Sequence, residues 1–532
     1  MATAAPDPRA AVDAGDVVLG VELGSTRIKS VLVDRTGTVL ATGGHTWENR
    51  FVDRVWTYDE DDVVTGLQAS FGSMCDDAEQ RHGARPTAFA AIGVSAMMHG
   101  YVALDADDRL LVPFRTWRNT STERAASELS AELGVNIPLR WSVAHLYQAV
   151  LDDEPHLPQL ARLTTLAGLV HHRLTGEHVL GVGDASGVFP VAADGTGYDA
   201  GLVRRFDELV ARSRPGLHVL DLLPRVAGAG TPAGRLTAEG ARLLDPTGRV
   251  EAGAPLCPPE GDAGTGMVAT NAIAPRTGNV SVGTSVFAMV VLEEPLSRVH
   301  PEVDLVTTPD GHPVAMVHCN NGASELDAWA GVFGRFAEAA GHGLGADEVF
   351  RVLLREALDA DADAGGLIAF NNLSGEPVTG LDEGRPLHLR TPDSRLTLGT
   401  FVRAQVYAAF AALALGMRVL EDEGVRLDVL VGHGGVFRTP EVAQRLLAAA
   451  LRTPVAVDDR AGEGGAWGIA VLACFLVRDD DADLPGWLGT HVFTGSTAHV
   501  VEPHDADVAG FAEFLRRYEA ALAVERAAVT HT

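Results

Sequence analysis

Residues suited to phosphate chemistry lie together near the N-terminus, between Asp16 and Asp34. Two apolar, β-branched runs flank the short segment Gly24-Ser25-Thr26, a pattern that predicts a β-hairpin. Glycine lets a ligand approach the backbone, and the N–H groups and hydroxyls of such a turn can bind phosphate oxygens. Glu22, just before the turn, is suited to hold a magnesium ion through water. An ordinary buried hairpin is the alternative interpretation.

The use of lysine in this chain supports the phosphate interpretation. Lys29, on the second apolar run, is the one lysine among 42 basic residues, and the others are arginines. Lysine is a compact point charge that suits a phosphate group. Its placement beside the Gly24-Ser25-Thr26 turn therefore favours a role in binding phosphate.

A second segment repeats the strand, turn and strand pattern later in the chain. Between Gly278 and Leu292, the turn Gly283-Thr284-Ser285 separates two apolar runs. Self-similarity over a long period indicates an internal duplication. Two such turns could hold the phosphates of one ligand from both sides of a cleft between domains, although short turns also resemble each other by chance.

Asp262 begins a segment of small residues that is predicted to be helical. The helix dipole stabilises a carboxylate at such a position. There it can act as a general base that accepts the proton of a hydroxyl attacking a phosphate. The alternative is that Asp262 only caps the helix.

Two loops contain candidate contacts to a substrate. Met98 and His99 follow a predicted strand, where open α/β sheets commonly place ligand contacts. Trp117 and Asn119 belong to the polar, aromatic segment PFRTWRNT. Taken alone, His99 is better explained as a core or loop histidine, and Trp117 as a packing residue.

A glycine-rich turn in the last third of the chain is a candidate nucleotide contact. A buried strand runs into Gly432-His433-Gly434-Gly435, and an amphipathic helix follows. Bare backbone at Gly434 and Gly435 can admit a flat purine. The segment has neither the GxGxxG spacing of a dinucleotide site nor the GxxxxGKS of a P-loop.

Composition limits the class of protein. A chain of 532 residues that is 46% hydrophobic can form two domains, and its alternating strands and helices predict an α/β fold. The net charge of −29, with no basic run, argues against a nucleic-acid or membrane partner. No apolar run approaches about 20 residues, and residues 1–15 are acidic and contain prolines. We therefore expect a disordered leader and a soluble, cytoplasmic protein.

The order of these motifs resembles that of the FGGY carbohydrate kinases, within the broader sugar kinase, actin and heat-shock ATPase fold. The resemblance runs from about Val18 to about Cys474. The segments that carry it are the Gly24 turn, Met98-His99-Gly100, Trp117-Arg118-Asn119, Arg173 to Glu177, Gly261-Asp262, the Gly283 turn, Leu373 to Glu376, Gly432 to Gly435 and Glu463 to Gly468.

The resemblance implies two actin-like, ribonuclease H-like α/β domains with the active site in the cleft between them. Residues 16–273 would form the N-terminal domain, which binds sugar and phosphates. Residues 274–500 would form the C-terminal domain, which binds the nucleotide, and residues 501–532 would form a helical tail. Dimers are common among such proteins, so a homodimer is one state that the resemblance allows.

The implied activity is phosphorylation of a small sugar by ATP with Mg²⁺. D-xylulose or L-ribulose is the first expectation, with transfer of the γ-phosphate to a hydroxyl that Asp262 deprotonates. Glu22 would hold the metal through water. The remaining implied contacts are Gly24, Ser25, Thr26, Lys29, Gly283, Thr284 and Ser285 to phosphates, Gly434 and Gly435 to adenosine, and Met98, His99, Trp117, Asn119 and Asp262 to the sugar.

The sequence departs from the family pattern at several positions. Glu22 stands where aspartate is usual, and His433 and Phe437-Arg438 replace smaller or polar residues. A divergent subgroup is indicated, and xylulose specificity is not carried over. Two other classes stay open: an ATPase of the same fold that acts on a protein partner, and a catalytically weak sugar-binding regulator. The Met98 loop with Asp262 argues against the first, and the lack of a basic helix-turn-helix pattern argues against the second.

Overall fold

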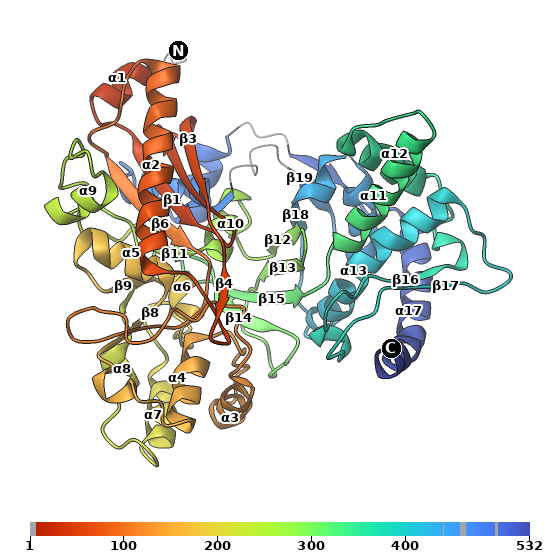
Figure 1. Cartoon of the computed structure of the whole chain (residues 1–532), viewed down its shortest axis with the longest axis horizontal. Coiled ribbons are helices and arrows are strands. Elements are labelled where there is room, and N and C mark those ends of the chain that lie inside the picture. The colour runs from red at the N-terminus through yellow and green to blue at the C-terminus, as the bar shows by residue number, and fades with distance from the viewer. Residues whose placement is uncertain (1–6, 440, 458–463, 495–497) are drawn as a thin grey trace. The chain divides into compact units, whose positions relative to one another are not determined.

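The computed structural model describes residues 7–439, 441–457, 464–494 and 498–532 (Figure 1). Glu463, the first residue of one predicted helix, lies outside these residues. The chain divides into two compact units, each assembled from segments that are distant in sequence. Unit 1 comprises Met1–Ile273, Leu305–Pro313 and Glu463–Gly495, and unit 2 comprises Ala274–Asp304, Val314–Gly462 and Ser496–Thr532.

The central sheet of unit 1 contains the predicted first hairpin. Its strands are β1 (Val18–Leu23), β2 (Arg27–Val33), β3 (Val39–Thr46), β6 (Ala91–Ala96) and β11 (Glu260–Gly261). The strand order is β11-β6-β1-β2-β3. The hairpin β1-β2 and its neighbour β3 are antiparallel, whereas β1, β6 and β11 are parallel. Gly24-Ser25-Thr26 thus joins two adjacent strands at the middle of the sheet.

Helices pack on both faces of this sheet (Figure 1). Side chains of β1 alternate between the faces, so Val21 belongs to the same core as Leu67. Gly20 faces the opposite way. A Cβ atom on Gly20 would lie 2.2 Å from the carbonyl oxygen of Ala466, so glycine is required for the second helix to approach the strand. The two helices are α2 (Glu60–His82) and α15 (Gly464–Leu476).

Other elements of unit 1 surround the sheet or extend from it. Helices α3, α4, α7 and α8 gather at one end of the unit (Figure 1). The bounds are β4 (Arg50–Val52), β5 (Val55–Thr57), β7 (Val102–Leu104), α3 (Glu123–Leu133), α4 (Ser142–Leu151), β8 (Arg162–Thr164), α5 (Leu166–Thr175), β9 (Val179–Gly181), α6 (Val182–Ser186), α7 (Ala200–Val210), α8 (Val219–Leu222), β10 (Arg225–Ala227), α9 (Ala238–Leu244), α10 (Asp262–Ala269) and α16 (Leu484–Trp487).

The N-terminal segment differs from the expected disordered leader. Its described part, residues 7–15, contains helix α1 (Pro8–Asp13). The Asp7 side chain caps the helix by accepting a hydrogen bond from the Arg9 N–H at 3.1 Å. Val12 is buried in the core of unit 1. A cap and one anchored apolar side chain order a segment whose composition alone predicted disorder.

The sheet of unit 2 repeats the topology of unit 1. Its strands include β12 (Thr277–Val282), β13 (Val286–Val291), β15 (Pro313–Cys319), β18 (Val429–His433), β19 (Val455–Val457) and β20 (His499–Val501). The order β15-β13-β12-β18-β19 matches β3-β2-β1-β6-β11, and each pair of neighbours has the same relative direction. This repeat agrees with the internal duplication that the paired hairpins predict.

The longest apolar helix of unit 2 was not anticipated from the sequence. Helix α13 (Leu398–Asp422) is long and apolar enough to cross a membrane by length and composition, but 83% of its apolar window is buried within the protein. Arg403 on this helix is also buried, and it donates hydrogen bonds to Tyr407 and pairs with Asp507. A buried charge with such partners is a feature of a core helix.

Helices cover the sheet of unit 2, and the chain ends in a long one. Their bounds, with those of the remaining strands, are β14 (Asp304–Thr307), of which residues 305–307 belong to unit 1, α11 (Ser324–Ala339), α12 (Ala346–Leu358), β16 (Ile368–Phe370), β17 (Leu387–Leu389), α14 (Val442–Leu451) and α17 (Asp505–His531).

Candidate active site

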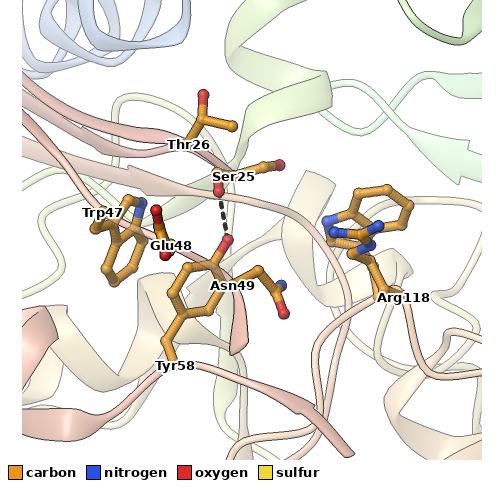
Figure 2. Close-up of a pocket in the computed structure, with 8 residues that line it drawn as sticks. Ser25, Thr26, Trp47, Glu48, Asn49, Tyr58 and Arg118 are labelled. Carbon is orange, nitrogen blue, oxygen red and sulfur yellow. Dashed lines mark hydrogen bonds between the residues drawn. The ribbon is translucent and has the colours of Figure 1, made fainter. Parts of the chain in front are cut away.

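The Gly24-Ser25-Thr26 turn borders a pocket of about 250 Å³ on unit 1 (Figure 2). Its lining combines aromatic rings with polar groups, as a site for a small polar ligand does. The lining residues are Ser25, Thr26, Trp47, Glu48, Asn49, Tyr58, Trp117 and Arg118.

Aromatic side chains of the pocket hold the turn in place. Trp47 donates its indole N–H to the Gly24 carbonyl at 2.7 Å, and the Tyr58 hydroxyl donates to the Ser25 carbonyl at 2.5 Å, the bond drawn in Figure 2. The rings of Trp47 and Tyr58 stack with centroids 4.0 Å apart. A turn fixed from outside in this way is pre-organised, so a ligand need not spend binding free energy to order it.

Glu22 and Lys29 occupy paired positions on β1 and β2. Glu22 also accepts a hydrogen bond from the Ala466 N–H, at the N-terminus of α15, at 3.3 Å. Burial raises the pKa of Glu22 to about 7, with Lys29 opposing the shift and Asp262 adding to it. The charges of Lys29 and Asp262 therefore both act on Glu22. Gly465 leaves room for the Glu22 carboxylate, because a Cβ atom there would lie 2.4 Å from Oε1.

Asp262 is the first residue of α10 and follows directly on strand β11. Its Oδ1 accepts hydrogen bonds from the Met98 N–H at 2.9 Å and the Ala263 N–H at 3.0 Å. Burial raises the pKa of Asp262, and these two N–H groups oppose the rise. The carboxylate is thus held in one orientation and joined to the Met98 loop, which is 164 residues away in sequence.

His99 is buried in a strained backbone conformation. Its φ of 69° lies in the left-handed region, which costs free energy for a residue other than glycine. The imidazole stacks on Trp141 with centroids 6.3 Å apart and lies against Gly187, where a Cβ atom would be 2.6 Å from Nδ1. The packing of Trp141 and Gly187 against this loop could not be predicted from the sequence, because no local motif marks either residue as a neighbour of His99.

Trp117 and Asn119 are placed differently from each other. Trp117 lines the pocket, with Arg118 beside it, and the Arg118 guanidinium lies 4.1 Å from the ring centroid of Trp56. Asn119 is buried. Its side chain accepts from the Trp56 N–H at 2.9 Å and donates to the Trp56 carbonyl at 2.8 Å. These bonds join Asn119 to the β4-β5 hairpin. Asn119 therefore holds the hairpin beside the pocket and does not line the pocket itself.

Two buried carboxyl groups near Asp262 were not predicted. Glu260 accepts a hydrogen bond from the Asp184 N–H at 2.8 Å, and Asp184 accepts one from the Thr165 hydroxyl at 2.6 Å. Burial raises the pKa of Asp184 to about 7, opposed by Thr165 and increased by Asp262; burial also raises the pKa of Glu260 well above its usual range. A cluster of titratable groups with raised pKa values is typical of active sites.

Replacing Asp184 by asparagine tests this cluster through pH. The pKa of Asp184 is about 3.9 in the unfolded chain, its usual value, and about 7 in the folded protein. Between these values the folded state holds a proton that the unfolded state has released, so this group makes wild-type stability fall as pH rises, by up to about 1.4 kcal/mol per pH unit.

The asparagine variant lacks this loss. Its free energy of unfolding, relative to wild type, is therefore expected to increase between about pH 4 and pH 7 and then to level off. Urea unfolding at several pH values measures the difference, and a difference that does not depend on pH would contradict the assignment.

The second predicted turn is held by two other segments of unit 2. Gly283-Thr284-Ser285 joins β12 and β13, and its carbonyls at Gly283 and Thr284 accept hydrogen bonds from the N–H groups of Ala323 and Gly322, both at 2.7 Å. Gly434 lies on the preceding strand, because a Cβ atom there would be 2.2 Å from the Val282 carbonyl oxygen. The second turn and the Gly434-Gly435 segment are therefore neighbours.

The donor set at Glu22 fits a magnesium ion. Magnesium prefers hard oxygen ligands such as carboxylates, often through water. Glu22 is half-buried, and the charge of Asp262 disfavours its ionised form. A cation beside these two groups would stabilise both carboxylates. The side chain of Glu22, a methylene longer than the usual aspartate, also reaches the N-terminus of α15.

Comparisons with known proteins cover most of the chain. Residues 17–245 match the N-terminal domain of the FGGY family of carbohydrate kinases, and residues 278–477 match its C-terminal domain. A curated glycerol kinase from Thermococcus gammatolerans is 24% identical over 181 residues, which are 32% of this chain and 36% of the relative. The match thus spans about a third of that relative's length.

Solved structures share the whole fold. A xylulose kinase from Rhodospirillum rubrum superposes with a TM-score of 0.76 at 20% identity, covering 96% of this chain and 98% of that chain. A gluconate kinase from Lactobacillus acidophilus superposes with a TM-score of 0.75 at 17% identity, also over 96% and 98%. At these identities the likeness establishes the two-domain sugar kinase fold. Together with the two domain matches, it places the chain in the FGGY family of carbohydrate kinases.

Proposed function

We propose that this protein is an ATP-dependent kinase of a small sugar, with Asp262 as the general base. The observation that carries the proposal is the attachment of the Asp262 carboxylate to the Met98 N–H, which joins a base of raised pKa to the loop proposed to bind the sugar. A base with a raised pKa takes a proton from a hydroxyl more readily at neutral pH. Phosphoryl transfer otherwise requires positioning and charge stabilisation.

The remaining roles divide between the two units. In unit 1 the Gly24-Ser25-Thr26 turn and Lys29 bind phosphate oxygens, and Glu22 holds Mg²⁺ through water. In unit 2 the Gly283-Thr284-Ser285 turn binds phosphates, while Gly434 and Gly435 contact the adenosine. When bound, Mg²⁺ neutralises charge on the phosphates. In this assignment unit 1 is the sugar and phosphate domain, and unit 2 is the nucleotide domain. Unit 1 therefore also contains residues 305–313 and 463–495 from the expected range 274–500, and unit 2 contains the expected tail, residues 501–532.

A ketopentose is the proposed sugar, either D-xylulose or L-ribulose. The support is the Met98-His99 loop and a pocket of about 250 Å³ with aromatic rings and polar groups on its walls. Met98, His99 and Trp117 contact the sugar in this proposal. Asn119 acts by holding the β4-β5 hairpin in place. Relatives named as glycerol and gluconate kinases make a polyol and a sugar acid the competing substrates.

Release of ADP with a panel of acceptors tests the proposal. The panel contains D-xylulose, L-ribulose, their epimers, glycerol and gluconate, each with ATP and Mg²⁺. We expect ADP release to depend on a ketopentose and to be at least about tenfold faster with it than with glycerol or gluconate. A reaction without added acceptor is the control for ATP hydrolysis.

Other results of the panel select other functions. ADP release that no acceptor increases would replace the kinase with an ATPase of the same fold. Sugar binding without ADP release would indicate a regulator. Turnover with glycerol or gluconate alone would keep the kinase and correct the substrate.

A further inference from the structure

The Gly283-Thr284-Ser285 turn, called the second phosphate turn below, is hydrogen-bonded to the loop formed by residues 320–323. Gly322 N–H and Ala323 N–H donate to its Thr284 and Gly283 carbonyls. A Cβ atom on Gly322 would lie 2.3 Å from the Gly283 carbonyl oxygen, so no larger residue fits between loop and turn. Gly283 and Thr284 are themselves exposed. The position of the turn therefore depends on the loop beneath it.

Residues 371–376 hold this loop through side-chain amides. Asn371 donates its amide to the Gly322 carbonyl at 2.8 Å. Asn321 accepts hydrogen bonds on Oδ1 from the Leu373 N–H at 2.9 Å and the Ser374 N–H at 3.0 Å. Both asparagines are buried, so an unpaired amide group there would be costly.

Glu376 completes the attachment of this loop. Its Oε2 accepts from the Asn321 side-chain amide at 3.1 Å and from the Asn321 N–H at 3.3 Å. Glu376 is fully buried, and burial raises its pKa to about 7. The buried residues Asn321, Asn371 and Glu376 thus join the loop to residues 371–376 in one hydrogen-bonded network.

The C-terminal helix α17 closes over residues 371–379. Glu525 on α17 is fully buried, and its Oε1 accepts a hydrogen bond from the Asn372 amide at 2.8 Å. One residue on, Arg526 donates to the Thr379 carbonyl at 2.9 Å. The ring of Tyr518 lies 4.6 Å from that of Phe370. An unbroken series of contacts thus leads from the last turns of the chain to the second phosphate turn.

We infer that α17 belongs to the nucleotide-binding machinery, with Glu525 as a positioning residue that acts through Asn372 and the loop of residues 320–323 on the Gly283-Thr284-Ser285 turn. This inference rests on the proposed function. The inference assigns a role to the C-terminal tail: residues 505–531 hold the turn in the position in which it binds phosphates. Rigid placement of donors is what makes such a turn bind, because a movable turn loses affinity on ordering.

Replacing Glu525 by alanine tests the inference on the full-length protein. The change removes the acceptor of Asn372, and we expect the Kd for ADP with Mg²⁺ to rise about tenfold, within the range known for residues that couple to a site without touching it. The Kd for D-xylulose is expected to stay within about twofold. Calorimetric titration with each ligand measures both.

Glu525→Gln is the conservative variant and should rescue binding. Burial raises the pKa of Glu525, so an uncharged side chain of the same shape fits the site and can still accept from Asn372. We expect its Kd for ADP to stay within about twofold of wild type. Glu525→Asp, which is one methylene shorter, should lose affinity and serves if the alanine variant does not fold.

Glu519→Ala is the matched control on the same helix. Glu519 pairs with Arg418 at 2.7 Å on the surface, and its removal should leave ADP binding unchanged. Equal Kd values for ADP in wild type, Glu525→Ala and Glu525→Asp would overturn the inference, as would an equal loss of ADP and D-xylulose affinity.

The proposed function is judged separately, from turnover by the wild type. A wild type that binds ADP but phosphorylates no sugar would contradict the kinase proposal. The role of Glu525 would then be judged from the Kd for ADP of each Glu525 variant relative to wild type. A wild type that does not bind ADP would end both.

Discussion

Asp262→Asn is expected to lower kcat for sugar phosphorylation by about 10²-fold to 10⁴-fold, the usual contribution of a general base. Asparagine keeps an oxygen that can accept the hydrogen bonds from Met98 and Ala263, so the fold around the site should persist. It cannot take a proton from the acceptor hydroxyl. Steady-state kinetics at saturating ATP and sugar measure kcat, and calorimetry should find the affinity for ADP within about twofold of wild type.

A matched control separates catalysis from helix capping. Asp199 caps α7, and its side chain accepts from the Gly201 and Leu202 N–H groups at 2.8 and 2.9 Å. Asp199→Asn should leave kcat unchanged, because asparagine caps a helix about as well as aspartate. If Asp262→Asn also kept wild-type kcat, Asp262 would be only the first residue of its helix.

Gly434→Ala is expected to lower the free energy of unfolding by about 3 kcal/mol and to weaken ADP binding. Gly434 has φ 113° and ψ 173°, a conformation that is almost restricted to glycine. Its missing side chain lets it pack on Val282, the residue before the second phosphate turn. Forcing the two strands apart should therefore also move the turn. Urea unfolding and calorimetric titration with ADP measure the two effects.

The neighbouring glycine provides the control for stability. A Cβ atom on Gly435 would have no heavy atom within 4 Å, and its φ lies outside the left-handed region. Gly435→Ala without nucleotide should unfold at nearly the same urea concentration as wild type. Equal stability of the two alanine variants would show that the contact between Gly434 and Val282 is not tight.

Features encoded in short stretches of sequence were predicted correctly from the sequence. The β1-β2 and β12-β13 hairpins each depend on two apolar runs and a turn of three residues, so the pattern is complete within about 20 positions. The repeat of the hairpin predicted an internal duplication, and the repeated strand order of the two units agrees with it. The family resemblance followed because the order of such local motifs survives when overall identity is as low as 20%.

Composition was a weaker guide to order and burial. The N-terminal segment appeared disordered by its acidic, proline-containing composition, yet Val12 anchors helix α1 in the core. Helix α13 reaches the length and apolarity of a membrane span, and only its buried contacts, including the pair of Arg403 and Asp507, make it a core helix. The average composition of a segment does not predict which of its side chains will be buried or paired in the folded protein.

By itself the sequence determined the two hairpins, because each is complete within a short stretch, and the family, because its short motifs follow one another in a set order along the chain. Asp262 as the base stays a prediction. Only the tertiary structure decided how these residues are supported. It joined Met98 to Asp262, turned Asn119 toward Trp56, and tied Glu525 to Asn372 across 153 residues. Such contacts depend on sheet order and helix packing, which bring distant segments together and leave no local pattern to read.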